Sequence, residues 1–375
     1  MIDWIQWREQ FPVTQKYIYM NHAGIAPLSL RVQDAMRDFL RDATYNGAVH
    51  SDGWAETAEA CRRSAAKLIN ADASEIAFMK NTTQGLIIAA NGIDWREGDN
   101  VVTTAVEFPA NVYPWWSLKA RYGVEVRMIP EREGTIQIEE IEAAIDSRTR
   151  VVTISHVQFA SGFRTDIAAI GEICRQNGIW FVVDAIQSVG VIDLDVKACG
   201  VDILAADGHK WLLAPEGAAI FYCVKEKQDR LINTNLGWAG VINPRDFLDY
   251  ELTQKSDATR FEEGTYNSVG LYGLGAAIDL LLEIGIPQIE RRVLDLTNRL
   301  IEGLASKGYR LVTPTDESQR SGIVAFESDQ YSPTELCEML ERENVIGAER
   351  GGVRLSPHFY NSEAEIDHVL SALPD

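Results

Sequence analysis

The sequence predicts an α/β fold: a large domain with a mainly parallel, doubly wound sheet, followed by a small C-terminal α+β domain. Short apolar runs alternate with helical periodicity as far as Tyr222, a pattern typical of βαβ units. From about Ile289 the pattern changes to helix, strand, strand, helix. With 375 residues, 46% of them hydrophobic, the chain is long enough for two domains that share a core.

Composition argues against several classes of protein. The formal net charge of −20 disfavours nucleic-acid binding, which needs clustered Lys and Arg. No apolar run reaches the roughly 18–20 residues of a membrane span. The first residues, MIDWIQWREQF, do not resemble a signal peptide. Five scattered cysteines form no CxxC pair, which indicates reduced thiols and no metal site. We therefore expect a cytoplasmic protein with no nucleic-acid or membrane partner.

The N-terminal segment, residues 1–25, is expected to be an arm that ends in a loop. Gly and Pro interrupt the sequence here, within Asn21-His22-Ala23-Gly24-Ile25-Ala26-Pro27. A helical stretch from Arg31 to Ala43 follows. An ordinary turn would explain this loop by itself.

A candidate anion site follows the first predicted strand, Ile76 to Met79. The strand leads into Asn81-Thr82-Thr83-Gln84-Gly85, and a helical stretch begins near Leu86. Free backbone N–H groups at a helix start attract phosphate. A plain threonine N-cap is the alternative interpretation.

The stretch around which the chain is organised runs from Trp180 to Tyr222. An apolar run there ends on Asp184, and a second one leads to Lys210. A desolvated lysine loses its charge easily and becomes an amine nucleophile that forms Schiff bases. An aspartate at the end of a neighbouring strand is suited to hold a pyridinium proton. Both groups can reach the carboxyl edge of the sheet, where ligands bind in open α/β folds.

These residues carry a resemblance to a known family. Asp184-x-x-Gln187 followed by His209-Lys210 resembles the signature of class V aminotransferases. These are fold-type I pyridoxal phosphate (PLP) enzymes, among them cysteine desulfurases, kynureninases and isopenicillin N epimerase-like proteins. The resemblance implies a PLP Schiff base on Lys210, the expected catalytic residue. It also implies that Asp184 contacts the pyridine nitrogen, Gln187 the ring 3-oxygen, and His209 the phosphate or ring edge.

The same resemblance implies further roles along the chain. Arg354, in Gly352-Val353-Arg354-Leu355, matches the arginine that grips the substrate carboxylate, and a guanidinium suits a carboxylate. The segment RFEEGTYN resembles a motif whose threonine, here Thr265, reaches the phosphate of the neighbouring subunit. A homodimer with shared active sites is therefore expected. The remaining expected contacts are Thr82 and Thr83 with the phosphate, Phe108 with the ring face, and Asn21, His22 and Ala23 with the amino-acid substrate.

Three positions depart from the family pattern. Phe108 stands where desulfurases have a histidine, so any proton transfer by that histidine is absent. Phe159 replaces an asparagine that contacts the cofactor, and we expect Gln158 to substitute for it. Asp207 stands where many relatives have a phosphate-binding Ser or Thr. A carboxylate would repel phosphate, so we expect Asp207 to point elsewhere or to pair with a cation.

The predicted reaction is less specific than the predicted cofactor. Standard cysteine desulfurases need a nucleophilic cysteine shortly before the carboxylate-binding arginine, and residues 344–353 contain none. Cys337 lies in a predicted helix. We therefore predict an aminotransferase or epimerase-like enzyme, with a C–S or C–C lyase as the alternative. A non-catalytic α/β scaffold is a third hypothesis, but the chain has no GxGxxG fingerprint or Walker A motif.

The predicted domains follow from these assignments. Residues 1–25 form the arm and active-site loop, residues 26–260 the large PLP-binding domain, and residues 261–375 the interface loop, linker helix and small domain. Substrate selectivity is expected to involve the 21–26 loop and four aromatic residues, Tyr113, Trp115, Trp238 and Tyr266.

Overall fold

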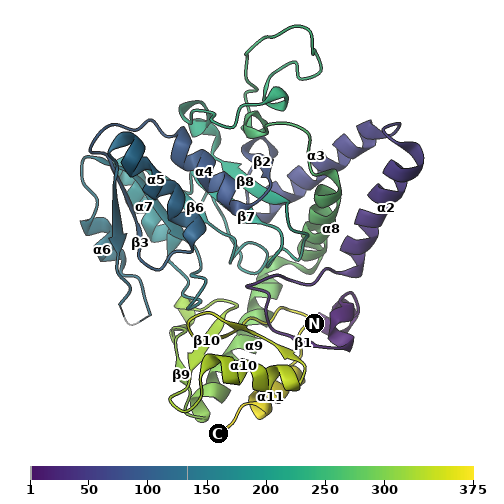
Figure 1. Cartoon of the computed structure of the whole chain (residues 1–375), viewed down its shortest axis with the longest axis vertical. Helices are drawn as coiled ribbons and strands as arrows, with labels where there is room; N and C mark the ends of the chain where they lie inside the picture. The colour runs from purple at the N-terminus through teal and green to yellow at the C-terminus, as the bar shows by residue number, and fades with distance from the viewer. Residues whose placement is uncertain (1, 133) are drawn as a thin grey trace.

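A computed structural model describes residues 2–132 and 134–375, which form two lobes (Figure 1). The larger lobe contains a sheet of seven described strands in the order β2-β8-β7-β6-β5-β3-β4. Only β8 runs antiparallel to its neighbours within this sheet. The strands are β2 (Ile76–Met79), β3 (Asn100–Thr104), β4 (Glu125–Ile129), β5 (Thr149–Ser155), β6 (Trp180–Asp184), β7 (Ile203–Asp207) and β8 (Ala219–Cys223).

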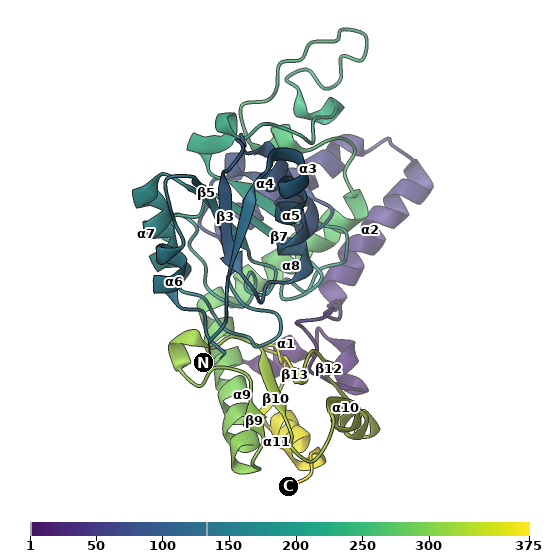
Figure 2. The ribbon, with the colours of Figure 1, turned by 60° about the vertical axis from the view of Figure 1, so that its left-hand side comes forward.

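Helices cover both faces of this sheet (Figures 1 and 2). One face packs against α4 and α5, and the other against α3, α7 and α8. The long helix α2 lies against α8 at the side of the lobe. The helices are α2 (Leu30–Asn46), α3 (Ser51–Leu68), α4 (Thr82–Gly92), α5 (Tyr113–Tyr122), α6 (Ile138–Ala143), α7 (Ile167–Asn177) and α8 (Ser268–Ile284).

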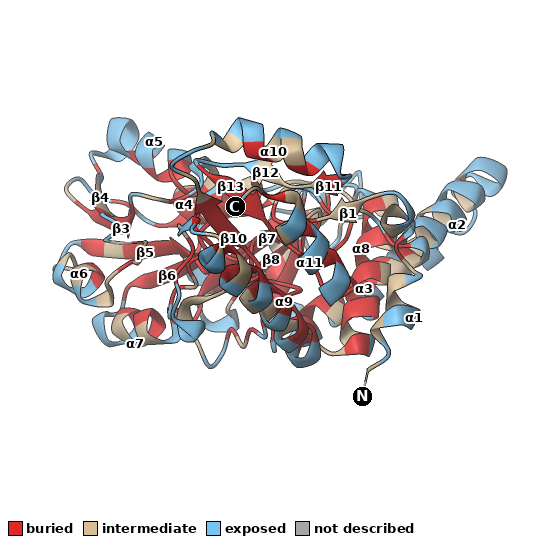
Figure 3. Cartoon of the chain, turned by 90° about the horizontal axis from the view of Figure 1, so that it is seen from below, coloured by how far each residue is buried: buried red, intermediate tan, exposed pale blue. Residues whose placement is uncertain are grey.

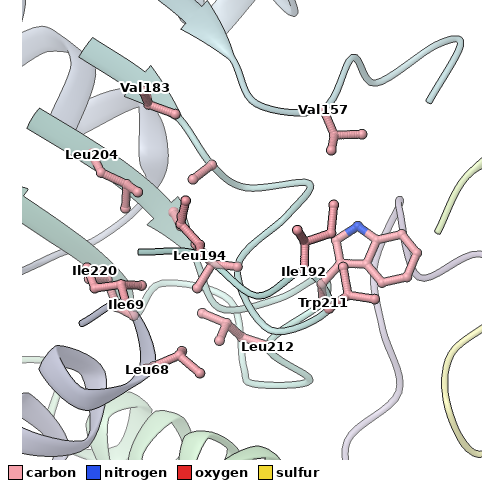
Figure 4. Close-up of a cluster of buried hydrophobic side chains, with 14 of the residues drawn as sticks. Leu68, Ile69, Val157, Val183, Ile192, Leu194, Leu204, Trp211, Leu212 and Ile220 are labelled. Atoms are coloured by element: carbon pink, nitrogen blue, oxygen red, sulfur yellow. The ribbon is translucent and has the colours of Figure 1, made fainter. Parts of the chain in front are cut away.

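The central strands β6, β7 and β8 are almost entirely apolar because both faces of the sheet are buried there, whereas the edge strand β4 carries Glu125 and Arg127. Successive side chains of a strand point to opposite faces. Val182 therefore joins the cluster under α4, while Val183 joins the cluster on the other side. Figure 4 shows Val183, Leu204 and Ile220 side by side from adjacent strands, with Trp211 at the edge of the same cluster. The residue after Lys210 is thus anchored in the core.

The smaller lobe is an antiparallel sheet of described strands in the order β12-β13-β10-β9, packed against three helices (Figure 2). Its elements are α9 (Ile286–Ser306), β9 (Arg310–Leu311), β10 (Val324–Glu327), α10 (Pro333–Arg342), β11 (Val345–Ile346), β12 (Ala348–Glu349), β13 (Val353–Leu355) and α11 (Glu363–Ala372).

The N-terminal arm joins the smaller lobe, beside which the N-terminus lies in Figure 1. It contains α1 (Trp4–Arg8) and β1 (Ile18–Tyr19), and β1 pairs in parallel with β11. Arg8 donates two hydrogen bonds of 2.8 Å to the carboxylate of Glu365 on α11. The two ends of the sequence thus build one lobe, and the loop after β1 passes from it to the larger lobe.

The boundary between the lobes falls between α8 and α9. α8 packs on α2 and α3 and stays with the larger lobe, although it follows the predicted boundary at residue 260. Among the described residues no single helix is long and apolar enough to cross a membrane; α8 and α9 pass that test only as a pair bent by 81°. The strands are mostly buried, whereas the surrounding helices have exposed outer faces (Figure 3).

Candidate active site

A cavity of about 400 Å³ lies at the carboxyl ends of β6 and β7, where the two lobes meet. Segments from distant parts of the chain line it: the loop after β1, the start of α4, the loops after β3 and β5, the ends of β6 and β7 with the segments that follow, and the β12–β13 hairpin. The lining residues are Ala23, Gly24, Ile25, Asn81, Thr82, Thr83, Phe108, Ala110, Phe159, Asp184, Ile186, Gln187, Asp207, His209, Lys210, Arg350 and Arg354.

Lys210 lies on the turn that follows β7. Its side chain enters the cavity, and Nζ is 5.7 Å from the centroid of the Phe108 ring. The pKa of Lys210 is lowered to about 8, mainly by burial and also by the positive charges of Arg354 and Arg350, while Asp184 and Asp207 act in the opposite direction. About a tenth of the side chain is therefore the neutral amine at pH 7, far more than for an ordinary lysine, and this is the form that acts as nucleophile or base.

Asp184 is the last residue of β6 and is 2% exposed. The recorded hydrogen bond to its carboxylate comes from the backbone N–H of Ile186, at 3.1 Å. Burial, with a contribution from Glu107, raises the pKa of Asp184 to about 7. A buried carboxylate with so few partners would be stabilised by a positively charged group in the cavity.

Glu107 lies behind Asp184 and is a fully bonded buried carboxylate. It accepts hydrogen bonds from Thr104 Oγ1 (3.0 Å), Asn111 Nδ2 (3.0 Å), Gln158 Nε2 (2.8 Å) and both the backbone N–H (2.9 Å) and the hydroxyl of Ser155. Gln158 therefore points away from the cavity, and our expectation that it substitutes for the family asparagine is wrong. Its neighbour Phe159 lines the cavity instead.

The start of α4 forms the anion-binding end of the cavity. Asn81 caps the helix by accepting a hydrogen bond from the backbone N–H of Gln84 (2.9 Å). Thr82 and Thr83, the first residues of the helix, line the cavity. Their backbone N–H groups have no carbonyl one turn earlier to bond, so a phosphate can accept from them and gain from the helix dipole.

Asp207, the departure from the family pattern, is paired with neighbouring groups. Its backbone N–H donates to Thr82 Oγ1 at 2.9 Å, and its carboxylate accepts from the N–H of Gly208 at 2.8 Å. The other carboxylate oxygen lies 3.1 Å from Nδ1 of His209. His209 also lines the cavity, so the carboxylate of Asp207 lies against Gly208 and the ring of a second lining residue.

Gln187 lines the cavity and connects three segments. Its Nε2 donates to the carbonyl of Ala23 (3.1 Å), and its Oε1 accepts from Nε1 of Trp211 (2.8 Å). An amide nitrogen carries two hydrogens, so one N–H of Gln187 is still available to a ligand. Of the residues 21–23, Ala23 lines the cavity.

His22 and Asn21 lie outside the cavity lining. The fully buried ring of His22 bonds through Nδ1 to the carbonyl of Ser356 (2.7 Å) and through Nε2 to the hydroxyl of Tyr360 (2.5 Å). A carbonyl only accepts, so Nδ1 carries the proton and Nε2 accepts from Tyr360. The side chain of Asn21 packs against Gly24, where an added Cβ would lie 2.6 Å from its Oδ1. His22 therefore holds the loop in place, and a direct contact of its side chain with substrate is wrong. The Oδ1 atom of Asn21 is buried with no hydrogen-bond partner among the described residues, so its contact with substrate stays a prediction.

Arg354 reaches the cavity from β13 of the smaller lobe. It is 2% exposed, and Nη1 donates to the carbonyl of Phe159 at 2.7 Å. Its Nε is buried with no partner among the described residues. Burial and the nearby Arg350 lower the pKa of Arg354 to about 10. A buried guanidinium with an unused donor fits a carboxylate ligand.

Arg350 is the cavity residue that the sequence analysis missed. It lies at the tip of the β12–β13 hairpin, and its side chain lines the cavity beside Arg354. The signal was present in the sequence, since an arginine precedes the glycine pair shortly before Arg354. Without the register of the hairpin, that arginine was indistinguishable from a surface residue.

Two aromatic residues expected to shape the cavity lie elsewhere. Trp115 is fully buried under the sheet and donates from Nε1 to Asn111 at 3.0 Å. Tyr266 donates to Glu262 at 2.6 Å. The predicted part of Trp115 in substrate selectivity is therefore wrong, because its side chain is fully buried. Tyr266 lines the same hollow as Thr265, and its part in selectivity stays a prediction.

Thr265 lines a second hollow of about 200 Å³, apart from the main cavity. Lys80, Gln84, Glu263 and Asn267 line the same hollow. Within one chain Thr265 therefore does not reach the phosphate end of the main cavity.

None of the described cysteines lines the cavity. Cys61, Cys174 and Cys223 are buried, and Cys199 and Cys337 are partly buried. Burial raises the pKa of Cys337 to about 11, which disfavours the reactive thiolate.

The cavity fits PLP on the chemistry of its side chains. The helix start at Thr82 suits the phosphate, and Asp184, short of hydrogen bonds, suits a protonated ring nitrogen. Lys210 has the lowered pKa that a carbonyl-binding amine requires.

Comparisons with known proteins agree with this geometry. The model of the family "Aminotransferase class-V" matches residues 18–369. The chain belongs to this family. Its cofactor is PLP, as the sequence predicted, and its fold is that of the fold-type I enzymes.

The relatives of this class V protein are named for two different reactions. A "Probable cysteine desulfurase" of Methanothermobacter thermautotrophicus is 32% identical, with 98% of this chain and 96% of the relative covered. An "Uncharacterized aminotransferase YcbU" of Bacillus subtilis is also 32% identical, with the same coverage. The apo structure of a cysteine desulfurase from Thermococcus onnurineus NA1 superposes with a TM-score of 0.90 at 28% identity, covering 97% of this chain and 95% of that one.

Proposed function

We propose that this class V enzyme is a C–S lyase, which expels a sulfur leaving group from Cβ of an amino acid by elimination. The observation that carries the proposal is the content of the cavity. It brings together Lys210, Asp184 and Arg354, but no described cysteine. The sulfur would leave as a free thiol, because the cavity offers no protein thiol to accept it.

Two considerations favour the lyase over the predicted aminotransferase or epimerase-like reaction. The desulfurase names of relatives that are 30–32% identical indicate chemistry at a C–S bond. Elimination also needs only a base at Cα and a path for the leaving group, and the cavity supplies both. Transamination remains the second candidate, supported by the aminotransferase name of the Bacillus subtilis relative.

In the proposed reaction several residues of the cavity have separate roles. Bound PLP supplies an electron sink for the pair released from Cα. Arg354 holds the α-carboxylate, so the orientation of the Cα–H bond is fixed. Lys210, which holds the cofactor through its amine, then serves as the base that removes the Cα proton. Asp184 would balance positive charge at the ring nitrogen of the bound cofactor, and Phe108, which also lines the cavity, would supply an aromatic contact to the ring.

The proposed enzyme acts as a homodimer. The segment from residue 236 to 252 projects from the larger lobe (Figure 1) and carries exposed apolar side chains. Contiguous exposed apolar residues of this kind mark association surfaces. A second copy would cover them and bring Thr265 to the neighbouring cavity. The exposed residues are Leu236, Trp238, Ile242, Phe247, Leu248, Tyr250 and Leu252.

The test is a product analysis of the purified protein loaded with PLP. Incubation should release pyruvate and ammonia in equal amounts, together with one equivalent of the sulfur product: sulfide from L-cysteine, cysteine persulfide from L-cystine and a thiol from S-substituted cysteines. The variant Lys210→Ala should release none. A keto acid that retains the substrate's side chain would instead establish the aminotransferase. Solvent deuterium entering Cα with no other product would establish racemisation.

A further inference from the structure

Arg350 is a cation of the cavity for which the reaction described above has no use. Its backbone N–H donates to the carbonyl of Gly352 (2.9 Å), which closes the hairpin. Its guanidinium donates from Nη1 to the carbonyl of Glu349 (2.7 Å). Within residues 2–132 and 134–375, no carboxylate lies within salt-bridge distance of it. The Nε and Nη2 donors therefore remain free.

The register of the hairpin places Arg350 and Arg354 on the same side. Ala348 lies directly opposite Arg354, so their side chains share one face of the sheet. Arg350 follows Ala348 by two positions, which returns a side chain to that face. Both guanidinium groups line the cavity as a result. The effect of Arg350 on Lys210 and Arg354, whose pKa values it lowers, agrees with this placement.

The other basic side chains of the cavity each have an acidic neighbour or a predicted ligand. Asp184 and Asp207 attract Lys210, and Asp207 also lies against His209. Arg354, with its buried unpartnered Nε, matches the α-carboxylate of an amino acid. The phosphate end, at Thr82, is formed by a different lobe from the hairpin. A second guanidinium beside Arg354 is repelled by it unless another anion binds there.

We propose that Arg350 binds an acidic group at the far end of the substrate's side chain. This inference rests on the proposed function: the substrate is then a cysteine whose sulfur substituent carries a carboxylate or a sulfur oxyacid. Arg354 would take the α-carboxylate and Arg350 the distal anion. The apolar side chains of Phe159 and Ile25, which also line the cavity, suit the uncharged atoms between the two acids.

The chemical step balances without an added oxidant or reductant. Lys210 removes the Cα proton, and the Cβ–S bond breaks with its electron pair leaving on sulfur as a thiolate, which takes up a proton. The remaining 2-aminoacrylate reacts with water to give pyruvate and ammonium. In sum, one substituted cysteine and one water yield one thiol, one pyruvate and one ammonium. Arg350 faces the negatively charged thiol product and takes no part in the proton transfers.

A matched pair of substrates tests the inference. S-carboxymethyl-L-cysteine and S-carbamoylmethyl-L-cysteine have nearly the same shape, but only the first is acidic. We expect the wild-type enzyme to favour the acid by ~10- to 100-fold in kcat/KM, the effect of one charged hydrogen-bonded contact. Arg350→Gln should remove the preference, because it should lower kcat/KM for the acidic substrate and leave kcat/KM for the amide unchanged. Arg350→Lys should keep part of it.

A control variant and a binding measurement separate the outcomes. Arg342→Gln removes an arginine that is 73% exposed on α10, away from the cavity, and should leave the preference unchanged. Dissociation constants for the two substrates, from the change in the visible absorption of the bound cofactor, should show the same preference as kcat/KM. Because Arg350 is exposed at a hairpin tip, its variants should keep the wild-type unfolding midpoint.

Each alternative result has a distinct meaning. If Arg350→Gln lowers kcat/KM equally for the acidic substrate and for the amide, Arg350 acts on the α-carboxylate and the inference is overturned. The inference also fails if the acid is not preferred, or if the preference survives in Arg350→Gln, although thiol and pyruvate are released. If neither compound yields thiol or pyruvate, the lyase proposal fails instead, and the ratio of dissociation constants still decides the role of Arg350.

Discussion

The floor and the rim of the cavity are built in different ways. The floor consists of Lys210, Asp184 and Thr82, which lie at the carboxyl ends of strands or at a helix start in the larger lobe. The rim is the β12–β13 hairpin of the smaller lobe, which carries Arg350 and Arg354. The strands under the floor are buried on both faces, whereas the tip of the rim hairpin is exposed.

This difference separates reactivity from selectivity. The floor groups are held by core packing, and burial itself moves the pKa values of Lys210 and Asp184 towards neutrality. In the reaction that we propose, the rim groups act through charge presented to the substrate, and a hairpin tip can change its residues at little cost to the core. Substitutions in the floor should therefore change kcat, and substitutions in the rim should change the choice and affinity of substrates.

The largest effect is expected from Lys210→Ala. Loss of the amine removes both the attachment of the cofactor and the base at Cα, so kcat should fall ~10³-fold or more. The visible absorption of the purified protein should be altered as well. Lys197→Ala is the matched control, since this exposed lysine pairs with Asp72 far from the cavity. Retention of turnover in Lys210→Ala would refute the assignment of the floor.

Asp184→Asn should come next, with kcat reduced ~10²- to 10³-fold, the usual cost of removing one electrostatic group from an active site. Asparagine has nearly the same shape but cannot balance a positive ring nitrogen. Asp202→Asn is a suitable comparison because Asp202 is also buried in the sheet, where it accepts from the N–H of Phe181 (2.8 Å). That variant should lower the unfolding midpoint and leave kcat nearly unchanged. Equal losses of kcat in both variants would contradict a specific role for Asp184.

Arg354→Lys tests the rim. A lysine keeps the charge but loses the fork geometry, so kcat/KM should fall ~10- to 100-fold for every amino acid, acidic or neutral. The loss should appear mainly in KM. Arg310→Lys, in the same small sheet but 65% exposed, should have no such effect. A loss confined to kcat would mean that Arg354 contributes to the chemical step, as the floor residues do, and not to substrate binding.

The smallest effect concerns pH. The pKa of Lys210 is lowered to about 8, and only the neutral amine attacks the cofactor's aldehyde. Below that pH the ammonium form dominates. The rate at which the cofactor-free protein captures PLP should therefore rise about tenfold per pH unit up to about 8 and then level off. Rapid-mixing absorbance measures this rate, with N-acetyl-lysine, whose rate continues to rise above pH 8, as the reference. If the rate of the protein also keeps rising above pH 8, burial does not lower the pKa of Lys210.

Much of the floor was predictable because its signals are local in the sequence. A strand that ends on Asp184, and a strand that leads through His209 to Lys210, place their polar groups at one edge of a parallel sheet whatever the details of packing. The helix start at Thr82 was likewise recognisable from its own residues. Each of these positions lines the cavity.

The rim and the entry loop were not predictable in the same way. β1 pairs with β11, and His22 bonds to Ser356 and Tyr360, across most of the length of the chain. No local pattern signals such contacts. The sequence also did not distinguish Trp115, which is buried in the core, from an aromatic residue that faces a ligand.

By itself, the sequence determined the α/β class through its strand and helix periodicity, and it predicted PLP and the place of Lys210 in the cavity through short motifs at strand ends that resemble the class V family. Only the tertiary structure decided which arginines line the cavity, that His22 is a structural residue, and that no described cysteine reaches the cavity. These properties depend on how a hairpin, an arm and a sheet from distant parts of the chain meet. The relative positions of these segments depend on many packing contacts within and between the two lobes, and no single segment of the sequence specifies them.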